Sequence, residues 1–252
     1  MRNLWILAHP DDEILALHLA LESANSINFV IYLTDGLRSG STYPSELRQR
    51  EAKNAWNLIS INNTIIFFGS DNQLKDGSLS EGFKEFHFKS LIAIVSDLSF
   101  NRLITLDFEG GHQDHDATSL IANAIATELK VEILTFPAYR SSHPHFPLYA
   151  VMKQKNHNGS FAQIKRGRRI KLSLLSLKLM STYRSQKLTW VGLGLFVIYK
   201  YLFGKLSIIE PNKIQDIEAS VPDKFLYVQR KKAPLVDYPL LIKNLSKWIS
   251  LH

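Results

Sequence analysis

Cysteine is absent from this chain of 252 residues. Its absence excludes disulfide bridges and every metal site built on thiolates. A metal ion bound by this protein must therefore be held by histidine, aspartate or glutamate, a ligand set that suits zinc or a similar divalent ion.

Long hydrophobic runs are absent too. A membrane-spanning helix needs about 18 to 20 mostly apolar residues in succession, whereas the most apolar segment, Trp190–Phe203, has 14 residues and contains a lysine. Its length predicts a buried or interfacial helix. At the start of the chain, Asn3–Ala8 is too short for the core of an export signal and charged residues follow at once, so a cytoplasmic location is expected.

Acidic residues are missing from one long stretch. Between Ile133 and Ile209 there is no Asp or Glu, but there are 13 Lys or Arg. The formal net charge is +7, and the rest of the chain holds 17 basic and 23 acidic residues, a balance of −6. This asymmetry predicts that the basic stretch faces something anionic. The alternative is a solvated basic face that has no partner.

The first half of the chain alternates between short apolar runs and helical patterns. Runs rich in β-branched and aromatic residues predict strands, at Asn3–Ala8, Ile27–Leu33, Thr64–Phe68, Arg102–Leu106 and Val131–Phe136. Helical spacing predicts helices between them, over Asp12–Ser23, Ser45–Leu58 (with Ser45 as its cap), Phe83–Asp97 and Asp116–Leu129. Alternation of this kind predicts an α/β fold with a mostly parallel sheet flanked by helices.

After Pro137 the alternation ends. A long loop is expected over Ser141–Asn158, and its three histidines, His143, His145 and His157, are interpreted as surface residues. A basic helix over Gln163–Tyr183 and the apolar segment described above then form a basic, largely helical C-terminal extension. We expect a core over residues 1–140 and a substrate-loop and basic helical region over 141–252, which returns to the core as a strand near 221–228.

Two polar clusters follow strands of the predicted sheet. His9, Asp11 and Asp12 come directly after the first strand, and Pro10 restricts the turn between them. Adjacent carboxylates need a positive partner, which a divalent cation supplies. The alternative is that an aspartate caps the next helix and that the histidine belongs to the core.

The second cluster, His112-Gln113-Asp114-His115, follows the fourth strand. Parallel strands end at one edge of a sheet, where ligands bind, so the two clusters are expected to meet. His9, Asp12 and His115 would then form an open three-ligand site in which the pKa of bound water falls to about 7. A polar loop with a helix cap is the alternative. Further roles are assigned to Asp11 as general base, His112 as oxyanion stabiliser or acid, and Asp114 as the residue that orients His112.

These motifs resemble the PIG-L/LmbE-like N-acetylglucosaminyl deacetylase family. The resemblance rests on Ala8–Glu13 (AHPDDE) and on the later His-x-Asp-His, and it extends over residues 1 to about 140. Thr34-Asp35-Gly36 is similar to the family's turn after the second strand, and Arg48 with Glu51 resembles its Arg-x-x-Glu element. Residues 183–186 are similar to a family element ending in His-x-Ser-Gln, with Tyr183 in the place of the histidine.

The resemblance implies a Rossmann-like fold and the removal of an acetyl group from a glucosamine-type amine. It also implies that His9, Asp12 and His115 bind the metal and that Asp11 is the base. The metal is expected to be Zn²⁺, although Fe²⁺ also suits two histidines and one carboxylate.

The candidates for substrate contact have alternative interpretations. Arg48 would bind substrate or a phosphate, or it would pair with Glu51 on its own helix. Asp35 would line the pocket or form an Asx turn, and Tyr183 would hydrogen-bond at the site.

Basic residues beside apolar ones, around 165–177 and 190–203, suit an anionic membrane interface. The substrate is therefore expected to be an anionic N-acetylated sugar, phosphate-linked or lipid-linked, and the protein peripheral at the inner face of the membrane. Alternatives are an amidase for a non-sugar acyl amide, or a nucleic-acid-binding protein that uses its basic third. Nucleic-acid binding leaves both histidine clusters unexplained, so no nucleic-acid partner is expected.

Overall fold

The fold is known from a computed structural model that describes residues 1–22, 25–37, 40–60, 62–138, 152, 160–162, 164–208, 225–229 and 236–249. Its centre is a parallel sheet of five strands in the order β3-β2-β1-β4-β5. The strands are β1 (Arg2–Leu7), β2 (Ile27–Tyr32), β3 (Asn63–Ile66), β4 (Arg102–Leu106) and β5 (Glu132–Phe136). The predicted α/β class is confirmed.

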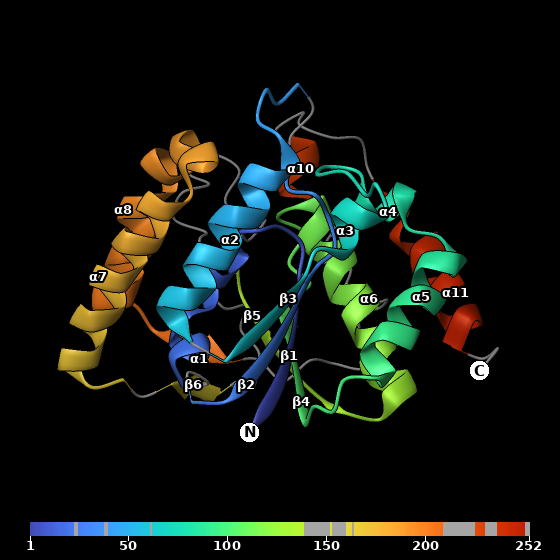
Figure 1. The fold of residues 1–252 in the computed structure, drawn as a ribbon, viewed down its shortest axis with the longest axis horizontal. Helices are drawn as coiled ribbons and strands as arrows, with labels where there is room; N and C mark the ends of the chain where they lie inside the picture. Colours follow the sequence, from blue (N-terminus) through green and yellow to red (C-terminus); the bar gives the residue numbers. More distant parts are fainter. Residues whose placement is uncertain are drawn as a thin grey trace.

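Helices cover both faces of this sheet (Figure 1). On one side lie η1 (Asp12–Ala16), α1 (Leu17–Glu22), α2 (Ser45–Ile59), α7 (Arg166–Thr182), η3 (Arg184–Gln186) and α8 (Lys187–Phe203). On the other side lie α3 (Phe68–Asp71), α4 (Leu79–Gly82), α5 (Glu85–Ser96), α6 (Gln113–Leu129) and α11 (Tyr238–Ile249).

Strand β1 shows why two layers of helices are needed. It is buried on both faces, and alternate side chains enter two separate hydrophobic cores. Trp5 and Leu7 join the core under α1, α2, α7 and α8, whereas Leu4 and Ile6 join the core under α5, α6 and α11. A strand with two apolar faces is stable only when both are covered, as in other parallel sheets.

The basic segment packs on the sheet through α7 and α8, which lie side by side at the left of Figure 1. Leu179 of α7 and Tyr201 of α8 belong to the same core as Trp5. A small antiparallel sheet is formed by β6 (Ser160–Ala162) and β7 (Leu206–Ile208), and β7 contacts β5 of the main sheet. In the part of the chain that the structure describes, none of the helices has the length and apolar character needed to cross a bilayer.

Most predicted elements agree with the structure within a few residues, but the starts of three helices differ. The helix expected over Asp12–Ser23 begins as a 3-10 turn and becomes α-helical at Leu17. Helix α6 begins at Gln113 rather than Asp116, so the second histidine cluster is part of a helix start. The residue before α2 is Pro44, and Ser45 does not cap the helix.

The strand expected over 221–228 is wrong where the structure describes it. Residues Leu226–Gln229 form a short helix, α10, and the flanking Phe225 packs in the core of α6 and α11. The long loop with His143, His145 and His157 lies outside the described residues. The division of the chain near residue 140 therefore stays a prediction.

Candidate metal centre

The turn after β1 carries the first polar cluster to the carboxyl edge of the sheet. The amide of His9 donates to the Asp12 carboxylate at 2.8 Å, and the amide of Ile14 donates to the Asp11 carbonyl at 3.1 Å. Asp11 has a positive φ of 129°, a conformation that side chains disfavour and that a surrounding structure must enforce. Strain of this kind at a strand end is typical of functional turns.

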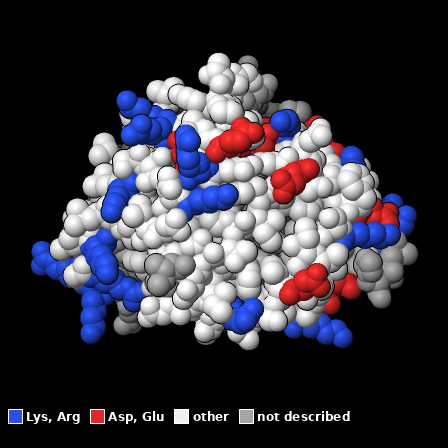
Figure 2. All heavy atoms as spheres, viewed as in Figure 1, with Lys and Arg blue, Asp and Glu red and all other residues white. Residues whose placement is uncertain are grey.

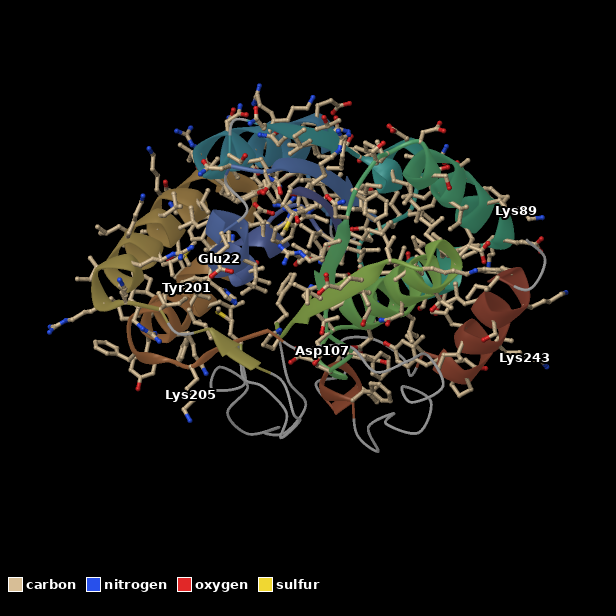
Figure 3. All side chains as sticks on the ribbon, turned by 90° about the horizontal axis from the view of Figure 1, so that it is seen from below. Glu22, Lys89, Asp107, Tyr201, Lys205 and Lys243 are labelled. Atoms are coloured by element: carbon tan, nitrogen blue, oxygen red, sulfur yellow. The ribbon has the colours of Figure 1, made fainter. Side chains whose placement is uncertain are left out.

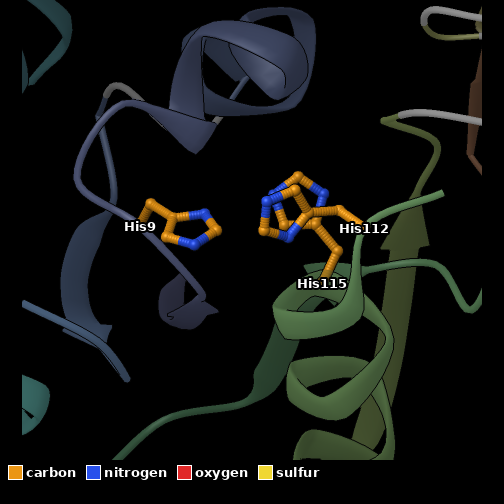
Figure 4. A group of neighbouring side chains, drawn as sticks. All are labelled: His9, His112 and His115. Atoms are coloured by element: carbon orange, nitrogen blue, oxygen red, sulfur yellow. The ribbon is translucent and has the colours of Figure 1, made fainter. Parts of the chain in front are cut away.

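The second cluster reaches the same edge from the start of α6. His112 is the N-cap residue, and its Nδ1 accepts a hydrogen bond from the Asp114 amide at 3.3 Å. Figure 4 shows the His9 ring facing the rings of His112 and His115 across a small space. Their ring centroids lie 4.8 to 5.2 Å apart. The meeting of the two clusters, predicted from the strand ends, is observed.

Asp12 lies close to both of the histidines that are expected to share a cation with it. The Asp12 carboxylate oxygen Oδ1 lies 3.1 Å from His115 Nε2 and 3.7 Å from His9 Nδ1. Ligand atoms about 2.0–2.1 Å from a tetrahedral zinc ion are separated by roughly 3.3 Å. One nitrogen from each of His9, His112 and His115 also falls within a 4.8 Å group. The three imidazoles therefore have the spacing of a divalent-ion site, and Asp12 lies next to two of them. The ligand set of His9, Asp12 and His115 stays a prediction.

The charges of the site are arranged around Asp12. Burial alone would raise its pKa, but the positive charge and hydrogen bond of His115, with those of His9, hold the pKa of Asp12 well below its usual value. Burial and the charges of His115 and His9 lower the pKa of His112 to about 4. Asp12 is thus an anionic donor, as metal binding requires, and His112 is a neutral imidazole.

The Asp114 carboxylate contacts His9 rather than His112. Its Oδ2 lies 3.0 Å from His9 Nε2, and its two oxygens accept hydrogen bonds from the amides of Gly77 and Leu79. The expected hydrogen bond that orients His112 is therefore replaced by one that orients His9. Because Nε2 faces Asp114, Nδ1 of His9 is left to face Asp12, and a carboxylate of this kind fixes the tautomer of a ligating histidine.

Asp11 lies over the start of α2, where Arg48 holds its turn. Arg48 Nη2 donates to the Pro10 carbonyl and lies 3.4 Å from Asp11 Oδ1. Burial, opposed by the charge of Arg48, raises the pKa of Asp11 to about 6. A carboxyl group with a pKa near neutrality is suited to proton transfer.

Arg48 is itself buried, at 1% exposure. Its Nη1 donates to Ser185 Oγ at 3.3 Å and lies 4.0 Å from Glu51 Oε2, and Glu51 accepts from both the amide and the hydroxyl of Ser185. The Arg-x-x-Glu pair thus connects the Asp11 turn to η3. The ion pair with Glu51, the alternative interpretation of Arg48, is present, whereas a contact with substrate stays a prediction.

Asp35 forms the Asx turn. Its Oδ1 accepts from the amides of Leu37 at 3.0 Å and Asp76 at 3.2 Å, and its Oδ2 accepts from Lys75 Nζ at 2.7 Å. The carboxylate is only 3% exposed. Asp35 therefore ties the turn after β2 to residues 75 and 76, and its expected place in the pocket wall stays a prediction.

Tyr183 is fully buried beneath the site. Its hydroxyl donates to Glu13, which also accepts from the Tyr32 hydroxyl at 2.9 Å. Burial raises the pKa of Glu13 to about 7, although Tyr183 donates to it. The contact assigns Tyr183 to a buried hydrogen-bond network under the Asp11–Asp12 turn, and its expected contact with substrate stays a prediction.

Asp76 is a site residue that was not predicted from the sequence. Its Oδ1 lies 3.4 Å from His9 Nε2, and one atom from each of His9, Asp76, His112 and Asp114 falls within a second 4.8 Å group. Burial opposes the charged form of His9, but Asp76, Asp114 and Asp12 together raise the pKa of His9 well above its usual value. The available signal was Asp76-Gly77, a turn dipeptide that follows a predicted strand.

Comparisons with known proteins agree with this geometry. Residues 4–126 match the model of the PIG-L family, described as GlcNAc-PI de-N-acetylase, and this part of the chain belongs to that family. The match includes every residue of the two polar clusters. No curated protein sequence matches the chain.

Solved structures show the same fold at low sequence identity. A deacetylase triple mutant from the teicoplanin biosynthetic pathway superposes with a TM-score of 0.61 at 14% identity, covering 84% of this chain and 99% of that one. The zinc-inhibited form of teicoplanin deacetylase gives 0.57 at 13%, covering 82% and 96%. A conserved protein from Thermus thermophilus gives 0.55 at 18%, covering 83% and 94%. At these identities the likeness establishes the fold.

Proposed function

We propose that the protein hydrolyses the amide of an N-acetylated amino sugar with a divalent cation held by His9, Asp12 and His115. The observation that carries the proposal is the position of Asp12 Oδ1, 3.1 Å from His115 and 3.7 Å from His9, residues from two separate strand ends. Two imidazoles and one carboxylate leave a coordination position open, as in catalytic rather than structural sites. The PIG-L match over residues 4–126 supports the acetyl sugar as substrate class.

A bound divalent cation supplies Lewis-acid activation of water and of the amide carbonyl. The chain's own residues handle the protons. Asp11 accepts a proton as water adds to the carbonyl carbon, and the carbon–nitrogen bond then breaks to give acetate and a free amine, which takes up a proton. Arg48 keeps the Asp11 carboxylate in place through the Pro10 carbonyl.

His112 and Asp76 face the same space and complete the site. His112 is neutral at physiological pH because burial and its histidine neighbours lower its pKa, so it offers a hydrogen bond to the oxyanion or the departing nitrogen. Asp76 lies 3.4 Å from His9 and its side chain is 13% exposed, which leaves it within reach of a sugar hydroxyl or the product amine.

Zinc is the cation that we propose, because His, Asp and His are its usual open catalytic set. Iron(II) binds the same donors, so purified protein should be analysed for metal before and after chelation. The cytoplasmic location and the anionic or phosphate-linked character of the substrate stay predictions.

The test is acetate release from a panel of N-acetylated amino sugars, free, phosphate-linked and lipid-linked, with acyl amides that contain no sugar as the matched comparison. We expect release from at least one sugar class, abolished by chelation and restored by the metal found in the protein. Release from acyl amides alone would replace the deacetylase proposal with a general amidase. Turnover that survives complete metal removal would overturn the site.

A further inference from the structure

Helix α8 carries large apolar side chains on its outer face. Leu188, Val191, Leu195, Tyr199 and Phe203 are 60% to 88% exposed. They are spaced by three or four residues, so they fall on one side of the helix. The opposite side is buried, and Tyr201 on that side accepts a hydrogen bond from the Leu17 amide at 2.9 Å. The helix is therefore fixed to the core, and the exposed stripe is its outer surface.

Helix α7, which packs against α8, also carries exposed apolar side chains. Ile170, Leu174 and Leu177 are 47% to 62% exposed and are also spaced by three or four residues. The two helices pack tightly, and a Cβ placed on Gly194 of α8 would lie 3.0 Å from Met180 Sδ of α7. We call these eight side chains the α7–α8 apolar face. Exposed apolar side chains in this number on two helices that pack together indicate an interaction surface rather than ordinary solvent exposure.

The charged residues of α7 and α8 themselves all have one sign, and Arg168 pairs with Glu22 of α1 at 3.9 Å. Residues 164–208 contain ten Lys or Arg and no Asp or Glu. Figure 2 shows lysines and arginines over α7 and α8 at the left edge, whereas the acidic side chains gather over the centre and right of that view. In Figure 3 Lys205 lies at this end of the molecule, and Lys89 and Lys243 lie at the other.

We propose that the α7–α8 apolar face docks on a lipid bilayer that contains anionic lipids. Apolar side chains that enter the acyl boundary, flanked by lysines and arginines that meet anionic headgroups, are the features of an interfacial helix. Neither helix is of the length and character to span a membrane, so the helices lie on the surface. A second copy of this chain is a poorer occupant, because symmetric pairing would bring two sets of cations together.

The apolar face begins beside the candidate metal centre. The turn η3 joins α7 to α8, and within it Ser185 donates to Glu51 and accepts from Arg48, which holds the Asp11 turn. Leu188, the most exposed residue of the face, lies only three positions further along the chain. Docking through this face would therefore bring the lipid surface to the side of the site.

The test is flotation of the full chain with phosphatidylcholine vesicles that contain or lack phosphatidylglycerol. We expect flotation with the anionic vesicles and little with the neutral ones. The double variant Leu188→Ser, Leu195→Ser should lower the partition coefficient roughly a hundredfold. Its matched control is Phe86→Ser, Leu240→Ser, because these residues of α5 and α11 are 64% and 52% exposed on the opposite side.

A second pair of variants tests the charges. The triple variant Lys171→Gln, Lys178→Gln, Lys187→Gln should lower the partition coefficient roughly a hundredfold, since each cation near an anionic surface contributes about a factor of five. The matched control replaces Lys89, Lys243 and Lys247 with Gln on the other side of the molecule. Thermal unfolding verifies that all variants are folded, as expected for exposed positions.

The docking surface would be overturned if the native chain stayed with the soluble fraction. It would also be overturned if the α8 variant floated as well as its control. A third contradicting result would be a concentration-dependent dimer that the α8 variant abolishes, together with no binding to vesicles.

A consequence for the substrate rests on the proposed deacetylase function. The α8 variant should deacetylate a soluble N-acetylated sugar as the native chain does, but should be slower on the same sugar anchored to vesicle lipid. Flotation without deacetylation of either substrate would leave the docking surface intact and would contradict the function alone.

Discussion

The carboxyl edge of the sheet buries charged side chains, whereas the α7–α8 apolar face exposes hydrophobic ones. Both arrangements are the reverse of what is usual in a folded protein. At the sheet edge, charged side chains such as Asp12, Asp114 and Arg48 are almost completely buried. On α8, leucines and aromatic residues are exposed to solvent. Buried charge persists only where partners or a cation compensate it, and exposed apolar surface persists where another surface covers it in use. Each departure is therefore the basis for one of the two proposed binding surfaces, one for an ion and one for lipid.

The two regions also differ in how their residues are held. Each of these buried charges at the sheet edge has several polar partners, so a single substitution disturbs a network. The exposed apolar side chains on α8 lie on the side of the helix opposite Trp190, Val197 and Tyr201, which pack in the core. We therefore expect substitutions at the sheet edge to change turnover, metal binding or stability strongly. Substitutions of the exposed side chains on α8 should change the free energy of unfolding only slightly.

The largest effect is expected from Asp11→Asn. An amide cannot accept the proton that the carboxylate takes, so kcat should fall about 10²- to 10⁴-fold, while the cation stays bound because Asp11 is not one of its ligands. Steady-state kinetics together with metal analysis measures both quantities. A variant that keeps native turnover would show that Asp11 is not the base.

A smaller effect is expected from Asp114→Asn. Asp114 orients His9 through its Nε2, and removing such a partner weakens metal binding about 10- to 100-fold. Competition with a chelator measures the affinity. Asp35→Asn is the control, because Asp35 ties the same 75–76 segment without contacting a histidine. If turnover fell while metal affinity stayed native, Asp114 would act on His112, as the sequence first indicated.

Arg48→Lys separates positioning from substrate binding. A lysine cannot reach the Pro10 carbonyl, Asp11 and Ser185 together, so the Asp11 turn should relax and kcat should fall about tenfold. KM should stay near its native value. A raised KM with native kcat would instead favour direct contact between Arg48 and substrate.

Tyr183→Phe should act on stability. It removes a hydroxyl that donates to buried Glu13, at a cost of about 1–3 kcal/mol. Denaturant unfolding measures the loss, with Tyr199→Phe, 60% exposed on α8, as the control. Native stability combined with a raised KM would instead indicate that Tyr183 contacts the substrate.

The smallest effect is expected from Leu195→Ser on the apolar face. This leucine is 76% exposed, so the free energy of unfolding should change by no more than about 0.5 kcal/mol. Thermal unfolding of the purified variant is sufficient. A loss above about 2 kcal/mol, the size expected for a core leucine, would mean that the face is covered in the free protein.

The sequence predicted the parts of the fold and site that depend on local patterns. The apolar runs placed the five strands, and the rule that parallel strands end at one edge brought His9 and Asp12 to His115. What it could not supply depends on three-dimensional detail. The partner of Asp114 depends on the orientation of two imidazole rings. Asp76 belongs to a turn near the site, and the sequence pattern of that turn gives only a weak indication of where it lies.

The C-terminal third likewise contains elements that the sequence predicts well and one that it does not. Helices α7 and α8 were predicted within a few residues of their observed bounds, α7 as a basic helical segment and α8 from the length of its apolar run. The segment near 221–228 is short and apolar, a pattern that strands and helical turns share. In the structure it ends in the short helix α10.

The central claim is that one divalent cation binds between the two strand ends, and titration of chelator-treated protein with zinc tests it most directly. We expect one equivalent bound per native chain, with His115→Ala losing that equivalent while remaining folded. A native chain that binds no zinc or iron(II), or a His115→Ala variant that binds as tightly as the native chain, would contradict it.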